Sequence, residues 1–497
     1  MARELVIALR KQNHSVYEIS AALKERHILL SPTAIREILK EEGFAPLPRR
    51  LAEERPDFPR PVAEAVADAR LFSTTARRFT TRCGGLFLFI PHLVGLELDR
   101  IAKAGALPGS RMIPRDYAFR ASLALKLWSV ERKSHVMHLV NDQGLALFSG
   151  LNVTPKKSFL SEYSARVDPR NIGQFLGAWH DRVDDDHFFA GNSFDLDFHS
   201  VPFFGEDPVI ERHYVSARSR RQPSILVFLA QDSDSRAFCY SNANLRKGEE
   251  RDEILSFISF WKKNHGGLPL HLVFDSQLTT YANLRKLDEM GITFITLRRR
   301  SPTLLDEVKN LPMSAWRRIE LDVPARKYRF PRVYEQKVAL EGRSFRQFFI
   351  QDLGHDEPTI LLTNEKRTPA KILTRYAQRM LIENSISDAV RFFHMDSLSS
   401  AVGMKVNFDM ALLVVASGLY RRLGQQMRGY ADAKARSIFR DLLDTPADIE
   451  VAENQVLVRF HHRAHLPILV ASGLLDQSVI VPWWKNMTLR MTAEQPK

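Results

Sequence analysis

The stretch Leu268-Pro-Leu-His-Leu-Val-Phe-Asp275 carries the strongest indication of the fold. Its apolar run predicts a buried strand over residues 268–274, and Asp275 follows that strand directly. α/β sheets place their chemistry at the carboxyl ends of such strands, so Asp275 is a candidate functional residue. The alternative is that Asp275 only caps the helix expected over residues 281–290.

Strand and helix patterns alternate around this stretch. Strands are expected over residues 195–199, 224–230 and 237–243, and an amphipathic helix over 249–262 precedes the strand that ends at Asp275. Three strands, a helix and a further strand make an α/β order. Residues 292–365 are basic and rich in strand patterns, and helical periodicity returns over 369–386 and 407–427.

Two aspartates precede Asp275 in the segment Phe194-Asp-Leu-Asp-Phe-His-Ser-Val-Pro-Phe-Phe-Gly205. Asp195 and Asp197 are two residues apart, so both point to the same face of the expected strand. Either could approach a metal ion, and the sequence alone leaves the choice between them open.

A third carboxylate lies on the helix expected over residues 369–386. Tyr376 and Arg379 come seven and four residues before Glu383, so the three share one helix face. Hydrolysis of DNA needs an activated water and a stabilised leaving oxygen, and two divalent ions about 4 Å apart can supply both. Such hard ions prefer carboxylate ligands.

The first 45 residues predict a small helical domain. Ser15 and Glu18 have the spacing of a capping box, and Ser31-Pro32 can start a third helix. Three short helices with this spacing predict a helix-turn-helix DNA-binding domain, and the alternative is a generic three-helix bundle. The outward face of the third helix would present Thr33, Arg36 and Lys40 to a major groove.

The charge balance favours a nucleic-acid partner. The chain has 497 residues with 71 Lys+Arg against 58 Asp+Glu, a net charge of +13. It has two cysteines, Cys83 and Cys239, without a zinc-ligand spacing, which fits a reducing cytoplasm. The N-terminus lacks a signal peptide, and no apolar stretch is long enough to span a membrane. We expect a cytoplasmic, nucleoid-associated protein.

The combined motifs resemble those of the DDE transposases of bacterial insertion sequences, in the retroviral-integrase superfamily with its RNase H-like fold. The chain is similar to the subgroup marked by Tyr-x2-Arg-x3-Glu-x6-Lys, and it matches at Tyr376, Arg379 and Glu383. Val390 stands where the lysine is expected, with Arg391 next to it. The family's two aspartates map best onto Asp197 and Asp275, and residues 292–365 correspond to its strand-rich insertion.

The resemblance implies an enzyme that cleaves DNA at transposon ends and transfers the 3′-OH into target DNA. Asp197, Asp275 and Glu383 would bind two Mg²⁺ ions, for which Mn²⁺ could substitute, and Tyr376 and Arg379 would position DNA. Such enzymes act on double-stranded DNA as homodimers or larger assemblies. Other candidate DNA contacts, proposed from the residues alone, are Arg298, Arg299 and Arg300.

Together these features predict an α/β protein with an interrupted RNase H-like core. The expected division is a helix-turn-helix (1–45), a linker (46–65), a helical region (66–190) with one helix expected over 91–104, the first half of the core (191–291), the β-rich insertion (292–368), the closing helices (369–440) and a small C-terminal domain (441–497). Two other functions remain open: a catalytically silent DNA-binding protein descended from a transposase, and a metal-dependent nuclease without strand transfer.

Overall fold

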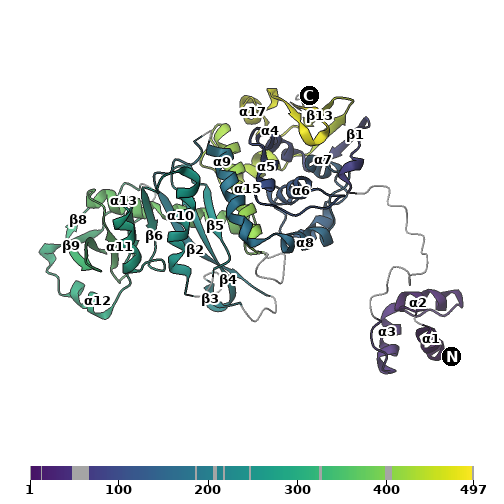
Figure 1. Ribbon diagram of the computed structural model, residues 1–497, viewed down its shortest axis with the longest axis horizontal. Helices are drawn as coiled ribbons and strands as arrows, with labels where there is room; N and C mark the ends of the chain where they lie inside the picture. The colour runs from purple at the N-terminus through teal and green to yellow at the C-terminus, as the bar shows by residue number, and fades with distance from the viewer. Residues whose placement is uncertain are drawn as a thin grey trace. The chain divides into compact units, whose positions relative to one another are not determined.

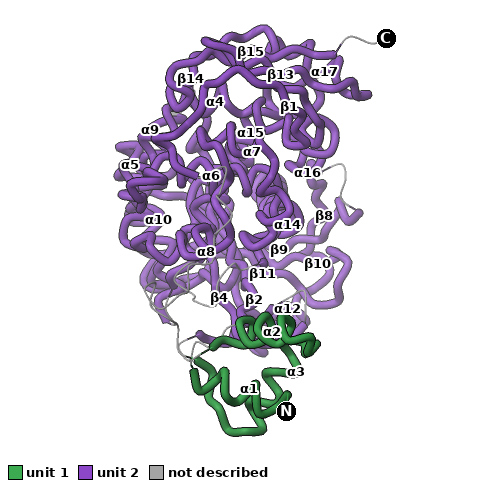
Figure 2. Tube along the Cα trace, turned by 90° about the vertical axis from the view of Figure 1, so that its right-hand side faces the viewer, with its two compact units in different colours: residues 1–64 green, residues 65–497 purple. Residues whose placement is uncertain are grey.

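The computed structural model divides into two compact units, residues 1–64 and 65–497 (Figure 2). The structure describes residues 2–12, 14–47, 67–184, 187–204, 210–215, 219–245, 248–323, 327–397 and 406–494. The linker predicted over 46–65 therefore lies almost wholly outside the described residues. Among the helices that are described, none is both long and apolar enough to cross a membrane.

The first unit consists of three helices, α1 (Ala2–Lys11), α2 (Val16–Glu25) and α3 (Pro32–Glu41). They enclose a small core that includes Val6, Ile19 and Ile35. The predicted capping box is confirmed, since the Ser15 hydroxyl accepts from the Glu18 amide and the Glu18 carboxylate accepts from the Ser15 amide at 2.6 Å. The side-chain caps at Ser15 and Ser31 fix where α2 and α3 begin.

A large sheet forms the centre of the second unit, and it confirms the α/β class. Its strands among the described residues are β2 (Phe194–Pro202), β3 (Arg212–Val215), β4 (Arg220–Asp232), β5 (Phe238–Asn242), β6 (His271–Phe274), β7 (Thr293–Leu297), β8 (Arg317–Arg318), β9 (Arg332–Leu340), β10 (Arg343–Gln351) and β11 (Thr359–Thr363). Their order is β3-β4-β2-β6-β7-β11-β10-β9-β8, and β5 also pairs with β4. β2, β6 and β7 are parallel, and β4 and β5 continue outward as antiparallel strands.

Helices cover both faces of this sheet. On one face Phe194 of β2 packs edge-on against Phe257 and Trp261 of α10 (Glu253–His265), at centroid distances of 5.2 and 4.5 Å. On the other face Val273 of β6 lies in a separate cluster with residues of α13 (Pro369–Gln378). α14 (Met380–Arg391) continues from α13 and contacts β2. Because side chains alternate along β2, Asp195 and Asp197 point toward α13 and α14.

The strand-rich segment 292–365 belongs to this same sheet. β7 pairs in parallel with β6, so the strand that we assigned to the start of the insertion lies beside the strand that ends at Asp275. β11, β10, β9 and β8 then extend the sheet by antiparallel pairing, with α11 (Tyr281–Glu289) before β7 and α12 (Pro302–Lys309) after it. The segment has the predicted strands. Its first strand, β7, lies within the central sheet beside β6, and the other strands continue that sheet outward.

A helical body packs beside β5 (Figure 1). It contains α4 (Ile90–Gly95), α5 (Leu98–Ala104), α6 (Arg115–Leu127), α7 (Gln143–Ser149), α8 (Lys157–Arg166), α9 (Ile172–Asp184) and α15 (Val406–Gln426). α15 is buried along most of its length because β5 contacts it on one side and α6 and α9 on others. The single helix predicted over residues 91–104 is two helices, because Glu97 adopts a left-handed conformation with φ 47°.

A second sheet joins distant parts of the chain. Its order is β1-β12-β13-β15-β14, formed by β1 (Arg77–Thr81), β12 (Ala447–Val451), β13 (Gln455–Phe460), β14 (Ser478–Val481) and β15 (Met487–Ala493). β1 comes from the segment predicted to be helical and pairs with β12. The indole N–H groups of Trp483 and Trp484 donate to the carbonyls of Phe148 and Leu147 in α7, at 3.0 and 2.7 Å. The C-terminal segment therefore shares its sheet and its core with residues 67–184.

The close approach of Gly85 to this C-terminal part generates a prediction. A Cβ on Gly85 would lie 2.0 Å from the backbone oxygen of Leu443, whereas a Cβ on Gly95 would meet nothing within 4 Å. We expect Gly85→Ala to lower the unfolding free energy by several kcal/mol through overpacking. The matched control Gly95→Ala should be neutral or stabilising by up to about 1 kcal/mol. Chemical denaturation of the two variants measures both effects, and equal midpoints would contradict this packing.

Candidate active site

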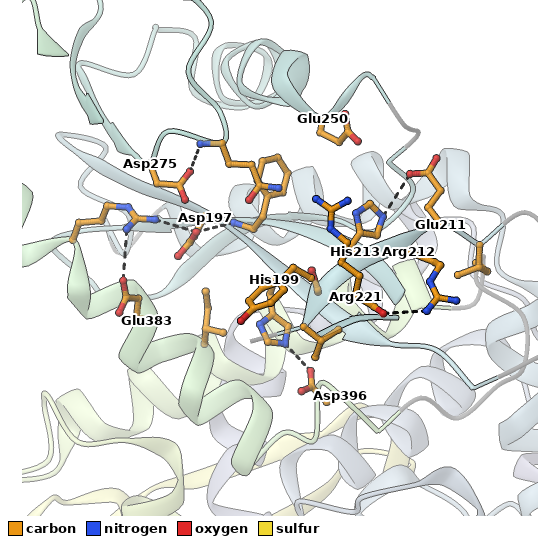
Figure 3. A pocket seen from close by; sticks show the side chains of 18 residues that line it. Asp197, His199, Glu211, Arg212, His213, Arg221, Glu250, Asp275, Glu383 and Asp396 are labelled. Atoms are coloured by element: carbon orange, nitrogen blue, oxygen red, sulfur yellow. Dashed lines mark hydrogen bonds and ion pairs between the residues drawn. The ribbon is translucent and has the colours of Figure 1, made fainter. Parts of the chain in front are cut away.

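Three carboxylates predicted from the sequence open onto one hollow of the second unit. Asp197, Asp275 and Glu383 line a pocket of about 1120 Å³, and Figure 3 shows them on the same side of it. They come from β2, from the loop after β6 and from the first turn of α14, respectively. Residues separated by up to 186 positions (383 − 197) thus meet at one site.

The parallel pairing of β2 with β6 explains why the two aspartates are neighbours. Asp195 pairs with Val273 in the register of the two strands. Two residues further along each strand, Asp197 and Asp275 occupy equivalent places and point to the same face of the sheet. The Asp275 carboxylate accepts from the Gln277 amide at 2.9 Å, while α11 is capped by Thr280. Asp275 therefore shapes its own loop and is not the cap of the next helix.

The Asp197 carboxyl is largely removed from water. Its side chain is 15% exposed, and it accepts a hydrogen bond from the Phe198 amide at 2.9 Å. Burial raises the pKa of Asp197 to about 6. The Arg379 guanidinium opposes this rise, whereas the Asp275 and Glu383 carboxylates add to it. Asp197 is thus an acid whose charge is disfavoured in the folded chain.

Arg379 is the cation between the carboxylates. Its Nη2 lies 3.0 Å from Asp197 Oδ1 and its Nη1 lies 3.6 Å from Glu383 Oε1. The arginine side chain is 9% exposed, and its buried Nε has no hydrogen-bond partner among the described residues. Arg379 stands at the junction of α13 and α14, where the predicted single helix is interrupted. Its guanidinium is therefore held mainly by charge.

The structure separates the roles of the two aspartates that the sequence left open. Asp195 is 1% exposed and pairs with Arg375 of α13, whose Nη1 lies 2.8 Å from Asp195 Oδ1. Asp195 does not line the carboxylate pocket, whereas Asp197 does. Tyr376 also stays outside this pocket and packs against the cluster of Val273 and α13. Of the Tyr-Arg-Glu motif, only Arg379 and Glu383 reach the pocket.

Several residues of the pocket wall were not predicted from the sequence. His199 lies two residues after Asp197 on β2, and its Nε2 is 2.7 Å from Asp396 Oδ1 (Figure 3). Tyr214 of β3 is 55% exposed and pairs across the strands with Arg221 of β4. His199 follows Asp197 at the spacing of one strand face, a signal that could have identified it as a residue of the same pocket.

The three adjacent arginines predicted to contact DNA do not line this pocket. Arg298 is held by the Gln347 side-chain oxygen and by the Tyr281 hydroxyl at 3.0 Å, and Arg300 pairs with Glu357. Arg299 is exposed and makes no ion pair or hydrogen bond with the described residues. In the first unit the exposed residues of α3 include Thr33, Arg36 and Lys40, as the helical spacing predicted. Of the three adjacent arginines, Arg299 is the one available to a partner.

The donor set of the pocket suits a hard divalent cation. Asp197, Asp275 and Glu383 supply only oxygen donors, and three carboxylates face one guanidinium. Within the described part of the chain, however, no group of three or more acidic, histidine or cysteine side chains is arranged to hold a metal ion. Arg379 lies between Asp197 and Glu383 instead, so the site is compensated by an internal cation.

No protein-family model matches the chain, and no curated protein matches it by sequence. Among solved structures the chain is similar to a piggyBac transposase in a synaptic complex with hairpin DNA. The two share 12% identity and a TM-score of 0.44 over 74% of this chain and 82% of the other.

The raised pKa of Asp197 predicts a pH-dependent stability. Because the pKa rises from 3.8 to about 6, the folded state binds this proton more tightly than the unfolded state. The stabilisation is full below about pH 4 and is lost as the pH rises through 6. Relative to wild type, Asp197→Asn should therefore gain up to about 3 kcal/mol in unfolding free energy between pH 4 and pH 8. Urea denaturation across this range measures the difference, and a pH-independent difference would contradict the assignment.

Proposed function

We propose that this chain is a DDE-type DNA transposase of the kind that bacterial insertion sequences encode. The observation that carries the proposal is the convergence of Asp197, Asp275 and Glu383 on one pocket from two parallel strands and a later helix. The strand order β5-β4-β2-β6-β7, with three antiparallel strands followed by two parallel ones, supports an RNase H-like core around it.

The reaction proceeds in two displacements at phosphorus. In the first, water attacks the phosphodiester at the transposon end, the bond to the 3′ oxygen breaks, and a 3′-OH and a 5′-phosphate form. In the second, that 3′-OH attacks a target phosphodiester and displaces its 3′ oxygen. Asp197, Asp275 and Glu383 would hold two Mg²⁺ ions, which when bound activate the attacking oxygen and stabilise the leaving one.

Basic residues of the chain would bind and orient the DNA. Arg379 lines the pocket beside the carboxylates, so a phosphate that enters the pocket would bind its guanidinium. Arg299 and the exposed face of α3 would contact DNA away from the reacting phosphate. The net charge of +13 favours such contacts.

The test of the proposal is cleavage and strand transfer on DNA that carries the element's own ends. With Mg²⁺, wild type should cut and join, while Asp275→Asn should bind the same DNA and lose at least a thousandfold in both rates, because one metal ligand is missing. A matched control is Asp288→Asn, a partly exposed acid on α11 outside the pocket, which should retain activity. If wild type binds and does not cut, the chain is a silent DNA-binding protein, and cutting without joining would indicate a nuclease.

The internal cation predicts a second result. In Arg379→Gln the carboxylates lose the charge that compensates Asp197, so Mn²⁺ should bind the DNA-free variant several-fold more tightly than wild type, because no ion pair must first break. Binding of DNA should weaken in the same variant. Isothermal titration with Mn²⁺ measures the first effect, and a lower affinity for Mn²⁺ would contradict the position that we assign to Arg379.

A further inference from the structure

A second ion pair lies one helical turn from the site, and it uses the same two elements. Arg375 and Arg379 are four residues apart along α13 and its end, and Asp195 and Asp197 are two residues apart on β2. Four helical residues advance about 6 Å and two strand residues advance about 6.6 Å. The two arginines are therefore spaced to pair with the two aspartates. Each of these ion pairs between helix and strand is called a rung below.

The rung of Arg375 is the better bonded of the two. Its Nη1 donates to Asp195 at 2.8 Å, and its Nε and Nη2 donate to Ser193 Oγ at 3.0 and 2.8 Å. The side chains of Arg375 and Asp195 are 11% and 2% exposed. The rung of Arg379 and Asp197 borders the carboxylate pocket, whereas the rung of Arg375 and Asp195 borders a second pocket of about 580 Å³. Arg375 is held by three direct hydrogen bonds, and Arg379 is held by its ion pairs.

The rung of Arg375 continues through a chain of polar contacts across the sheet. Ser193 Oγ lies 2.7 Å from His271 Nδ1 at the start of β6, and His271 Nε2 lies 2.5 Å from Glu365 Oε1 after β11. Glu365 in turn accepts from Arg367 at 2.8 Å. This Ser-His-Glu chain does not present a nucleophile, because the two hydrogen bonds from Arg375 engage the lone pairs of the serine oxygen. Its effect is to hold β2, β6 and the end of β11 to α13.

We propose that Asp195 and Arg375 form a clamp that positions α14, which carries Glu383, over β2, which carries Asp197. The inference rests on the proposed function for its consequence, since α13 leads directly into Arg379 and Glu383. With the clamp intact, α14 is held at one distance from Asp197 and Asp275. Asp195 and Arg375 are thus positioning residues, and neither lines the carboxylate pocket.

The first experiment measures the position of α14 without metal or DNA. Spin labels at Asn384→Cys on α14 and Lys286→Cys on α11 report the distance across the sheet, and both positions are exposed. The native Cys83 and Cys239 are buried and do not compete for the label. Double electron–electron resonance should give a narrow distribution in the otherwise wild-type chain. Asp195→Asn and Arg375→Gln should broaden or shift it.

The second experiment measures Mn²⁺ binding by electron paramagnetic resonance in the unlabelled chain. Asp195→Asn and Arg375→Gln should lower the affinity at least tenfold, and Arg375→Lys should fall between them and wild type because it keeps the charge but not the fork of donors. The dissociation constant for DNA should change less than twofold. In single-turnover cleavage, the loss should therefore appear in the rate and not in DNA binding.

Two further variants separate positioning from loss of folding. Asp232→Asn removes another buried aspartate of the same sheet, one whose carboxylate accepts from Ser235 and Gly191. It should reduce stability while leaving the distance distribution and the Mn²⁺ affinity unchanged. Ser193→Ala keeps the Asp195–Arg375 pair and should show a smaller change than Asp195→Asn, which keeps a measurement available if the latter does not fold.

The outcomes for the clamp and for the proposed function are distinct. An unchanged distance distribution in folded Asp195→Asn and Ser193→Ala would overturn the clamp whatever the activity of the chain. If the distributions broaden as expected but wild type neither binds Mn²⁺ nor cleaves DNA, the clamp stands and the transposase proposal fails.

Discussion

An ionised carboxylate loses its water when β2 is covered by α13 and α14, and this loss costs several kcal/mol unless a cation replaces the water. Two such carboxylates, Asp195 and Asp197, lie on the covered face. The arginines of the overlying helix satisfy them to different extents. Arg375 gives Asp195 a fully bonded partner, whereas Arg379 leaves Asp197 with a pKa raised to about 6. The pair with fewer hydrogen bonds, Arg379 and Asp197, is the one that lines the carboxylate pocket.

The sheet determines which acids can share that pocket. Parallel pairing puts Asp197, in the middle of β2, next to Asp275, which follows the end of β6, although the chain passes through three antiparallel strands and a helix between them. Glu383 arrives from the other direction, after the chain has built β7 to β11. Since those strands extend the same sheet, α13 returns over β7 and reaches β2 without crossing a separate domain.

Arg379 links the electrostatics of the site to its proposed substrate. The same guanidinium neutralises Asp197 in the chain by itself and would bind a phosphate when DNA enters the pocket. A phosphate and a carboxylate compete for one cation, and a divalent ion competes with that cation for the carboxylates. Binding of DNA and binding of metal would therefore assist each other at this site. The buried Arg375 does not take part in this exchange because its donors are already committed.

The sequence by itself predicted the local elements and the three carboxylates that line one pocket. Apolar periodicity predicted the strands that end at Asp275 and contain Asp197, and capping residues predicted α2 and α3, because these signals depend on neighbours within a few residues. The tertiary structure decided what depends on distant contacts. It selected Asp197 over Asp195 for the pocket, since only the packing of α13 shows which aspartate Arg375 covers. It also placed β1 beside β12, because strand pairing between remote segments leaves no periodic trace in the chain. The helix expected over 91–104 is interrupted at Glu97, whose left-handed conformation its apolar periodicity does not reveal.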